Sequence, residues 1–207
     1  MGTAATDAAR SRNMTLGAAN WYFAAANKSL AFNGAAHADI DITACSPSAE
    51  DSYALEMWFR GDKPAAGQTA TLFSVNGDSV AAQFTDQGAL RIIASGKEST
   101  VASVNCLDDL WHHFALNVLA GGSVTALIDG QNVVQFAPVR PLHFQADKLV
   151  LGAMRKPQTA GAADYAFSDY FNGNIDEVRL WNAKLSADVL RNRRNTRLEG
   201  SESGLAA

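Results

Sequence analysis

Cysteine is scarce in this sequence, and its scarcity limits the chemistry that the chain can carry. Among 207 residues only Cys45 and Cys106 occur. Because no CxxC pair exists, the sequence excludes a cysteine-ligated zinc site and a thioredoxin-like redox motif. A single disulfide between these two cysteines and two unpaired buried thiols are both compatible with the sequence, so cysteine use does not identify the compartment.

The sequence also lacks an excess of positive charge and long apolar runs. Its formal net charge is -4, whereas a nucleic-acid-binding surface needs a strongly positive field, so we expect no nucleic-acid partner. No apolar run approaches the roughly 20 residues that span a bilayer, so we expect no membrane insertion. Residues 1–17 lack the apolar stretch of a signal peptide.

Motifs of common enzyme classes are missing as well. No serine lies in a GxSxG elbow, and SGKES around Lys97 lacks the first glycine and the hydroxyl residue of a phosphate-binding loop. A retaining glycosidase needs two carboxylates about 5–5.5 Å apart. Asp39 and Asp41 share a strand face, but their flanks are those of an ordinary half-exposed strand. His112 and His113 would point to opposite faces of a strand, so they cannot chelate one metal together. We therefore expect no enzymatic activity.

Alternation of apolar and polar residues is the dominant pattern that is present. In residues 53–60, YALEMWFR, the side chains of Tyr53, Leu55, Met57 and Phe59 fall on one face of a predicted strand. Turn signals separate the alternating runs, and the strongest is Asp-Gly at 129–130, which favours a two-residue hairpin. Short strands separated by turns predict an antiparallel sandwich or barrel. Further strands are expected at residues 29–32, 38–42, 70–75, 79–85, 89–94, 100–104, 111–119, 124–128, 132–136, 148–151 and 175–181.

One short helix and two linkers complete the expected organisation. Ser186 can cap a helix over residues 187–194, and Asp188 suits the positive end of its dipole. Residues 155–168 are expected to form a long loop, of the kind that often carries function. We expect a linker at residues 1–17, one domain at residues 18–199 and a second linker at residues 200–207.

Five blocks of the sequence, in order, resemble laminin-G-like and concanavalin A-like jelly rolls, a superfamily to which the pentraxins are related. SLAFNG is similar to S-L-x-F-D-G, and YALEMWFR is similar to F-T-I-E-x-W-V-K. LWHHFALNV followed by LIDGQNV is similar to W-H-H-V-A followed by Y-V-D-G, and LVLGAM is similar to L-x-I-G. FNGNIDEVRLWNAKLS resembles F-x-G-x-I-D-E-V-R-I-W-N-x-x-L-S. The ordered set covers about residues 29–195.

The resemblance implies an all-β fold, a two-sheet antiparallel jelly-roll sandwich with one short C-terminal helix. It implies a binding or adhesive module rather than an enzyme, and the tail RLEGSESGLAA resembles the segment that leads from one such module into the next in extracellular proteins. The leading hypothesis is a lectin-like, carbohydrate-binding module of a larger secreted or cell-surface protein. The alternatives are an adhesion module that binds an extracellular protein without a sugar site and, third, a glycan-cleaving enzyme.

One acid in the last predicted strand calls for a partner. Strict alternation places Asp176 on the same face as Val178 and Leu180, and a buried carboxylate needs hydrogen bonds or a cation. Relatives often carry a structural calcium near the first-strand loop, so the resemblance implies a calcium site made by Asp176, Asn33 and Gly34. The alternative is that Asp176 accepts hydrogen bonds from the backbone amides of that loop. A pentraxin-type double-calcium site is not expected, because the segment GAMRKPQTAG contains no acid.

Two sets of residues are candidates for binding a ligand, since sugar sites combine flat aromatic rings with fixed polar groups. The first set is the polar face of residues 53–60, with Glu56, Trp58 and Arg60. The second set lies in and after the long loop, with Tyr165 and Tyr170. For the aromatic residues of both sets, the alternative is that they pack beneath a loop or against the helix.

Overall fold

The structure is a computed structural model of the 207-residue chain. It describes residues 4–6, 13–17, 20–24, 27–43, 52–75, 79–102, 104–119, 122–138, 148–157 and 165–206. Among these, residue 157 and all residues up to residue 28 are described by their backbone alone. Cys106 is a buried free thiol, and burial raises its pKa to about 12. Cys45, its candidate disulfide partner, lies outside the described residues.

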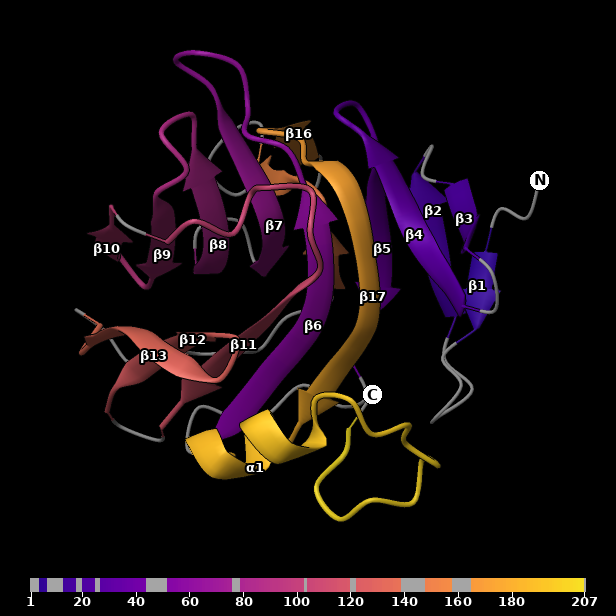
Figure 1. The fold of residues 1–207 in the computed structure, drawn as a ribbon, viewed down its shortest axis with the longest axis vertical. Coiled ribbons are helices and arrows are strands. Elements are labelled where there is room, and N and C mark those ends of the chain that lie inside the picture. Colours follow the sequence, from indigo (N-terminus) through magenta and orange to yellow (C-terminus); the bar gives the residue numbers. More distant parts are fainter. Residues whose placement is uncertain are drawn as a thin grey trace.

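Two antiparallel sheets form the fold (Figure 1). The eight-stranded sheet has the order β1-β2-β5-β14-β7-β8-β9-β10, and the seven-stranded sheet has the order β13-β12-β11-β6-β17-β4-β3, while β15 and β16 pair separately. This architecture confirms the predicted jelly-roll sandwich. The strands are β1 (Ala4–Thr6), β2 (Asn13–Gly17), β3 (Asn20–Ala24), β4 (Asn27–Asn33), β5 (His37–Asp41), β6 (Tyr53–Gly61), β7 (Thr69–Val75), β8 (Val80–Thr85), β9 (Leu90–Ala94), β10 (Lys97–Val101), β11 (His112–Val118), β12 (Val124–Ile128), β13 (Gln131–Phe136), β14 (Lys148–Leu151), β15 (Met154–Pro157), β16 (Tyr165–Ser168) and β17 (Asn172–Trp181).

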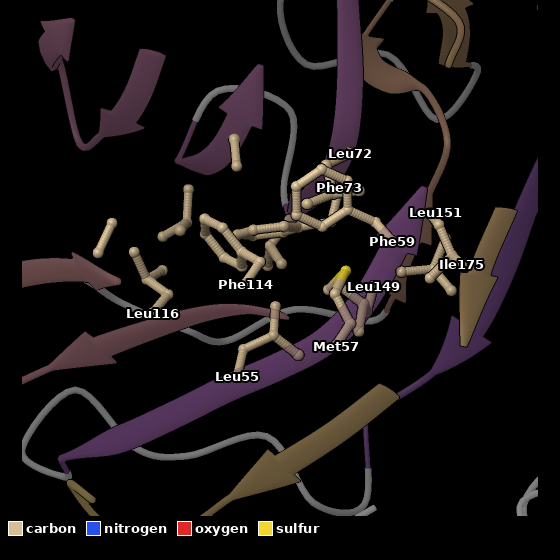
Figure 2. Close-up of a cluster of buried hydrophobic side chains, with 14 of the residues drawn as sticks. Leu55, Met57, Phe59, Leu72, Phe73, Phe114, Leu116, Leu149, Leu151 and Ile175 are labelled. Atoms are coloured by element: carbon tan, nitrogen blue, oxygen red, sulfur yellow. The ribbon is translucent and has the colours of Figure 1, made fainter. Parts of the chain in front are cut away.

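The apolar face of β6 forms the centre of the core. Tyr53, Leu55, Met57 and Phe59 are each no more than 1% exposed, and they belong to one cluster with residues of both sheets. Figure 2 shows the β6 side chains meeting labelled residues of β7, β11, β14 and β17. Burial of one side chain of this size contributes about 1.5–3 kcal/mol. Burial of the apolar face that alternation predicts is therefore the main source of the stability that holds the two sheets together.

The C-terminal helix α1 (Ala187–Arg193) begins where the sequence predicts and packs on the outside of the seven-stranded sheet. The side chain of Ser186 accepts a hydrogen bond from the backbone amide three residues later, at 3.2 Å. Leu190 is 1% exposed and packs against Ala115 of β11 and Leu127 of β12. Figure 1 shows α1 at one end of β6 and β17. Among the described residues, no helix is long and apolar enough to cross a membrane.

Both predicted linkers contain residues that pair with the sheets. β2 lies within residues 1–17 and pairs with β5, with Met14 opposite Ile40. At the other end, Leu205 is 2% exposed and forms an isolated bridge with Trp181. A five-residue strand and a single bridge are too short to leave a periodic signal in the sequence, and their pairing depends on backbone groups that all residues share.

Two predicted boundaries differ from the structure. Within residues 155–168, which were expected to form one long loop, the chain contributes most of the β15–β16 hairpin, and Arg155 pairs with Phe167. β10 begins at residue 97 rather than 100, because Ser95 and Gly96 close a tight turn with φ values of 41° and 82°.

Candidate functional site

A bulge in β17 decides which face Asp176 occupies. In the register with β6, Asp176 lies opposite Trp58 and Arg179 lies opposite Glu56, so two intervening residues of β17 oppose one residue of β6. The first of the two, Glu177, has a φ of 49°, in the left-handed region. The prediction of strict alternation through this strand is therefore wrong. Asp176 and Arg179 both point away from the core, to what we call the outer face of the seven-stranded sheet.

The partner of the Asp176 carboxylate is its own neighbour in the chain. The carboxylate accepts a hydrogen bond from the backbone amide of Glu177 at 2.8 Å. Partial burial raises the pKa of Asp176, and this hydrogen bond opposes the rise. In the loop of residues 33–36, the side chain of Asn33 accepts a hydrogen bond from the backbone amide of Ala35, at 3.1 Å. This loop therefore bonds to itself and not to Asp176.

The residues of the predicted calcium site do not converge. In the register of β4 with β17, Asn33 lies opposite Asn172, four strand positions from Asp176. Four positions correspond to about 13 Å, whereas two ligands of one calcium lie within about 5 Å of each other. Gly34 follows Asn33 and donates its amide to the Phe171 carbonyl at 3.1 Å. Within the described ranges, no group of three or more His, Cys, Asp or Glu residues is placed to hold a metal ion. The residues present therefore do not fit the implied calcium.

Glu56 lies in a buried polar cluster on the outer face. Its carboxylate contacts His113 Nε2 at 2.9 Å, accepts a hydrogen bond from Trp181 Nε1 at 2.9 Å, and lies 3.5 Å from Arg179 Nη1. All four residues are no more than 4% exposed. The carboxylate is fully engaged within the protein, so Glu56 is not placed to contact a ligand.

The segment from Leu185 through α1 to Thr196 covers this cluster. Arg179 donates to the carbonyl of Thr196 at 2.8 Å, and Trp58 Nε1 donates to the carbonyl of Arg194 at 3.0 Å. Asn117 of β11 bonds to the carbonyl and to the amide of Leu185, at 2.8 and 3.1 Å. One half of the outer face, with Glu56 and much of Trp58, is therefore occupied by the chain itself.

The other half of the outer face is open and presents an exposed indole. Trp111 is 39% exposed, and the guanidinium of Arg60 lies 5.7 Å from its ring centroid. Arg60 also donates to the side-chain oxygen of Asn174 at 3.2 Å and lies 3.5 Å from the carboxylate of Asp109. The side-chain amide of Asn174 is held in turn by the hydroxyl of Ser29, at 3.2 Å. We call Arg60, Asp109, Trp111 and Asn174 the Trp111 surface.

Backbone pairing places the members of the Trp111 surface next to one another. Arg60 lies directly opposite Asn174 on the neighbouring strand, and Trp111 precedes the first paired residue of β11. Since strands fix side-chain positions better than loops do, Arg60 and Asn174 are held in place before a ligand arrives. A flat ring beside a guanidinium, a carboxylate and an amide has the composition of a sugar site.

His112 anchors the loop that presents Trp111. Its two ring nitrogens lie 3.0 Å from Asp108 and 2.8 Å from Asp129, and Asp108 also accepts from the Leu110 amide at 3.0 Å. Partial burial is the largest influence on the pKa of His112 and lowers it, but the hydrogen bonds with Asp129 and Asp108 raise the pKa overall. The protonated imidazole therefore stabilises the folded state.

Replacing His112 by glutamine is expected to cost stability in a pH-dependent way. Because the folded-state pKa of His112 is raised, its contribution is complete below the unfolded value of about 6.5 and is lost as pH rises through the folded value. We expect a loss of about 1 kcal/mol at pH 5.5 and a smaller loss at pH 8.5, measured by urea unfolding.

His37 provides the matched control for that measurement. Burial lowers its pKa, so His37→Gln should show the opposite trend, with the smaller loss at pH 5.5. Equal pH dependence in the two variants would contradict the assignment of His112 as the protonated group.

Of the two predicted tyrosines, Tyr165 lies on the side of the eight-stranded sheet, away from the Trp111 surface. Tyr165 of β16 is 37% exposed, and the guanidinium of Arg155 lies 3.5 Å from its ring centroid. The hairpin that carries Tyr165 is bonded to Ser74 of β7, in the eight-stranded sheet. Tyr170 is half-buried between β16 and β17. Of the five predicted ligand-binding residues, the structure therefore places only Arg60 on the Trp111 surface.

Sequence reasoning missed three members of this surface, Asp109, Trp111 and Asn174. The sequence predicts Trp111 as the first residue of a strand, whereas the structure begins β11 at His112 and leaves Trp111 in the preceding loop. The available signal was the pair Leu110-Trp111 directly after two acids, because neighbouring apolar residues next to a turn cannot both be buried by one strand face.

The sequence matches the family model described as the concanavalin A-like lectin/glucanases superfamily, over residues 32–190. A search of curated protein sequences found no match. Among solved structures, the binding domain of Paraclostridial Mosquitocidal Protein 1 is 11% identical with a TM-score of 0.69, and the alignment covers 90% of this chain and 48% of that chain.

Two other similar solved structures are complexes with bound ligands. Domain 4 of an extracellular arabinanase from Geobacillus stearothermophilus, in complex with arabinotriose, is 17% identical with a TM-score of 0.58, over 85% of this chain and 81% of that domain. The binding domain of botulinum neurotoxin DC, in complex with SialylT, is 10% identical with a TM-score of 0.63, over 90% of this chain and 47% of that chain. The chain spans about half the length of the toxin domains. At these identities the likeness establishes the fold.

Proposed function

The chain belongs to the concanavalin A-like lectin/glucanase superfamily, and on this basis we propose that it is a non-catalytic carbohydrate-binding module of a larger secreted or cell-surface protein. One observation carries the proposal, the exposed Trp111 ring held beside Arg60, Asp109 and Asn174 on the open half of the outer face. The sugar ring stacks on the indole, and its hydroxyl groups bond to Arg60 and Asp109, while Asn174, which is 8% exposed, holds the guanidinium of Arg60 in place.

The charge of the Trp111 surface favours a neutral glycan. One guanidinium, that of Arg60, is paired with one carboxylate, that of Asp109, at 3.5 Å, so the surface has no excess charge to attract an ionic ligand. The arabinanase domain solved with arabinotriose and the toxin domain solved with SialylT support a glycan as the ligand class for this fold.

Replacing Trp111 by alanine is expected to weaken glycan binding at least tenfold, because the stacking surface is lost while the strands remain paired. A glycan array first identifies a neutral oligosaccharide that binds, and calorimetry then gives its Kd for wild type and variant. Tyr165→Ala is the matched control, since it removes another exposed aromatic ring among the described residues, on the hairpin beside the opposite sheet. Loss of binding in Tyr165→Ala with full binding in Trp111→Ala would overturn the site.

Two other outcomes would redirect the function. No binding across a diverse array, together with a defined extracellular protein that binds wild type and not Trp111→Ala, would favour an adhesion module. The neighbouring exposed side chain of Leu110, at 62%, would extend such a contact. Release of reducing sugars from a polysaccharide would instead identify a glycan-cleaving enzyme and contradict a non-catalytic module.

A further inference from the structure

A groove of about 430 Å³ lies on the outer side of the eight-stranded sheet, away from the Trp111 surface. Its volume is within the range of small-ligand sites. The side chains that form its floor alternate with core residues along β8 and β9, so they point away from the sandwich. The polar residues that line the groove are Gln83, Arg91, Lys97, Glu98, Lys156 and Asp169.

The floor of the groove is a chain of hydrogen bonds across three strands. Thr71 of β7, Gln83 of β8 and Arg91 of β9 lie opposite one another in register. The Gln83 amide donates to the Thr71 hydroxyl at 2.9 Å, and Arg91 donates to the Gln83 oxygen. Thr71 is fully buried and Gln83 is 2% exposed, so these groups have few alternative partners. The chain fixes the guanidinium of Arg91 at the surface, where its side chain remains 28% exposed.

The wall of the groove is equally well anchored. The hydroxyl of Ser74 in β7 holds the start of the β15–β16 hairpin through two hydrogen bonds. It donates to the Ala153 carbonyl at 2.9 Å and accepts from the Arg155 amide at 3.1 Å. This anchorage holds the exposed Lys156 over the groove. Asp169 accepts from the hydroxyls of Thr69 and Ser168, at 2.5 and 2.8 Å, so both of its oxygens are engaged.

The groove is positively charged in a protein that is negatively charged. Arg91, Lys97 and Lys156 line it against two carboxylates, Glu98 and Asp169, while the whole chain carries -4. The Glu98 side chain is 62% exposed, and its carboxylate lies 3.8 Å from the Arg91 guanidinium, which is beyond hydrogen-bond distance. The guanidinium can therefore still donate hydrogen bonds to a ligand. A planar guanidinium binds a carboxylate through two parallel hydrogen bonds, and a nearby ammonium adds attraction.

We propose that this groove is a second ligand site, which binds an acidic saccharide through its carboxylate. The carboxylate lies against Arg91 and Lys156, and the ring hydroxyls lie beside the hydrogen-bonded floor and the Glu98 carboxylate. The choice of a saccharide rests on the proposed function, but the site is independent of the Trp111 surface. One protein therefore reads a neutral sugar on one sheet and an acidic sugar on the other.

The test is calorimetric titration with trigalacturonate and with its neutral counterpart, galactotriose, at 0.05 and 0.15 M salt. We expect wild type to bind trigalacturonate more weakly at the higher salt, as ion pairing requires. Arg91→Gln should weaken binding at least tenfold, and Lys156→Ala, which changes an exposed side chain, should weaken it severalfold. Lys184→Ala, an exposed lysine next to α1, is the matched control and should bind as wild type does.

Several outcomes would overturn the second site. These are no binding of trigalacturonate, unchanged binding in Lys156→Ala and Arg91→Gln, or loss of trigalacturonate binding in Trp111→Ala, which would place the acidic sugar on the other sheet. Full competition by inorganic sulfate at the same affinity would reduce the groove to a simple anion site. The neutral glycan found on the array separates the two proposals. If only the second site is wrong, Trp111→Ala still weakens binding of the neutral glycan, and Arg91→Gln binds that glycan as wild type does.

Discussion

Replacing Glu56 by alanine is expected to lower the free energy of unfolding by about 3–5 kcal/mol, the cost of breaking a buried charge pair. The variant would leave the Arg179 guanidinium, which is 4% exposed, without its buried carboxylate, and it would leave Trp181 Nε1 and His113 Nε2 without their acceptor. Since this cluster lies beneath the segment that follows α1, part of the loss should be release of that cover. Urea unfolding gives the free energy, and hydrogen exchange of the amides of residues 185–199 reports the cover.

Glu177→Ala is the matched control for Glu56→Ala. Glu177 also contacts Arg179, at 2.8 Å, but its side chain is 46% exposed. A surface ion pair contributes about 0–1 kcal/mol, so we expect little change. Glu56→Gln adds a second comparison, because its amide oxygen can still accept from Trp181 while the negative charge beside Arg179 is gone. A loss in Glu56→Ala no larger than in Glu177→Ala would show that the buried cluster does not stabilise the fold.

Replacing Gly173 by alanine is expected to destabilise the protein by about 2–4 kcal/mol, the sum of backbone strain and overpacking. Gly173 lies opposite Gly61, the last residue of β6, at one end of the β6–β17 pair, and its φ is 150°. A Cβ atom there would lie 2.1 Å from the carbonyl oxygen of Arg60 and 2.9 Å from the Phe171 ring, so the two strands would have to separate. Urea unfolding measures the loss.

The same change should also weaken binding at the Trp111 surface, because it displaces the backbone of Arg60 and adjoins Asn174. Gly67→Ala is the control, since Gly67 has a φ of 75° but a Cβ atom there meets nothing within 4 Å. It should show the cost of strain alone, about 1–2 kcal/mol, and normal glycan binding. If Gly173→Ala matched Gly67→Ala in both measurements, the close approach of the strands at Gly173 would have no energetic importance.

The fold was predictable because one physical signal, alternation, dominates the sequence. In β6 the four apolar side chains that alternation placed together are the centre of the core. In β17 the same rule failed, because Glu177 adopts a left-handed φ and shifts the register by one residue. No residue type at this position announces a bulge, since glycine, the usual signal, is absent there.

The candidate site was less predictable because it depends on contacts between distant segments. Glu56, Trp58 and Arg60 are equivalent in sequence, on the same face of one strand. Trp58 is separated from its acceptor, the Arg194 carbonyl, by 136 positions, and the Glu56 cluster involves Trp181 at a separation of 125. Periodicity describes one strand at a time, so it cannot show which half of a face a remote helix will cover.

The division of the outer face by the C-terminal segment has a consequence for how this scaffold can diversify. The covered half locks the C-terminal segment, while the open half carries Arg60 and Asn174 on two paired strands and Asp109 and Trp111 in the loop that leads into β11. Randomising positions 60, 109 and 111 should therefore yield a repertoire of specificities on an unchanged framework, much as variable loops do on an antibody, with one strand end and the adjoining loop as the variable element.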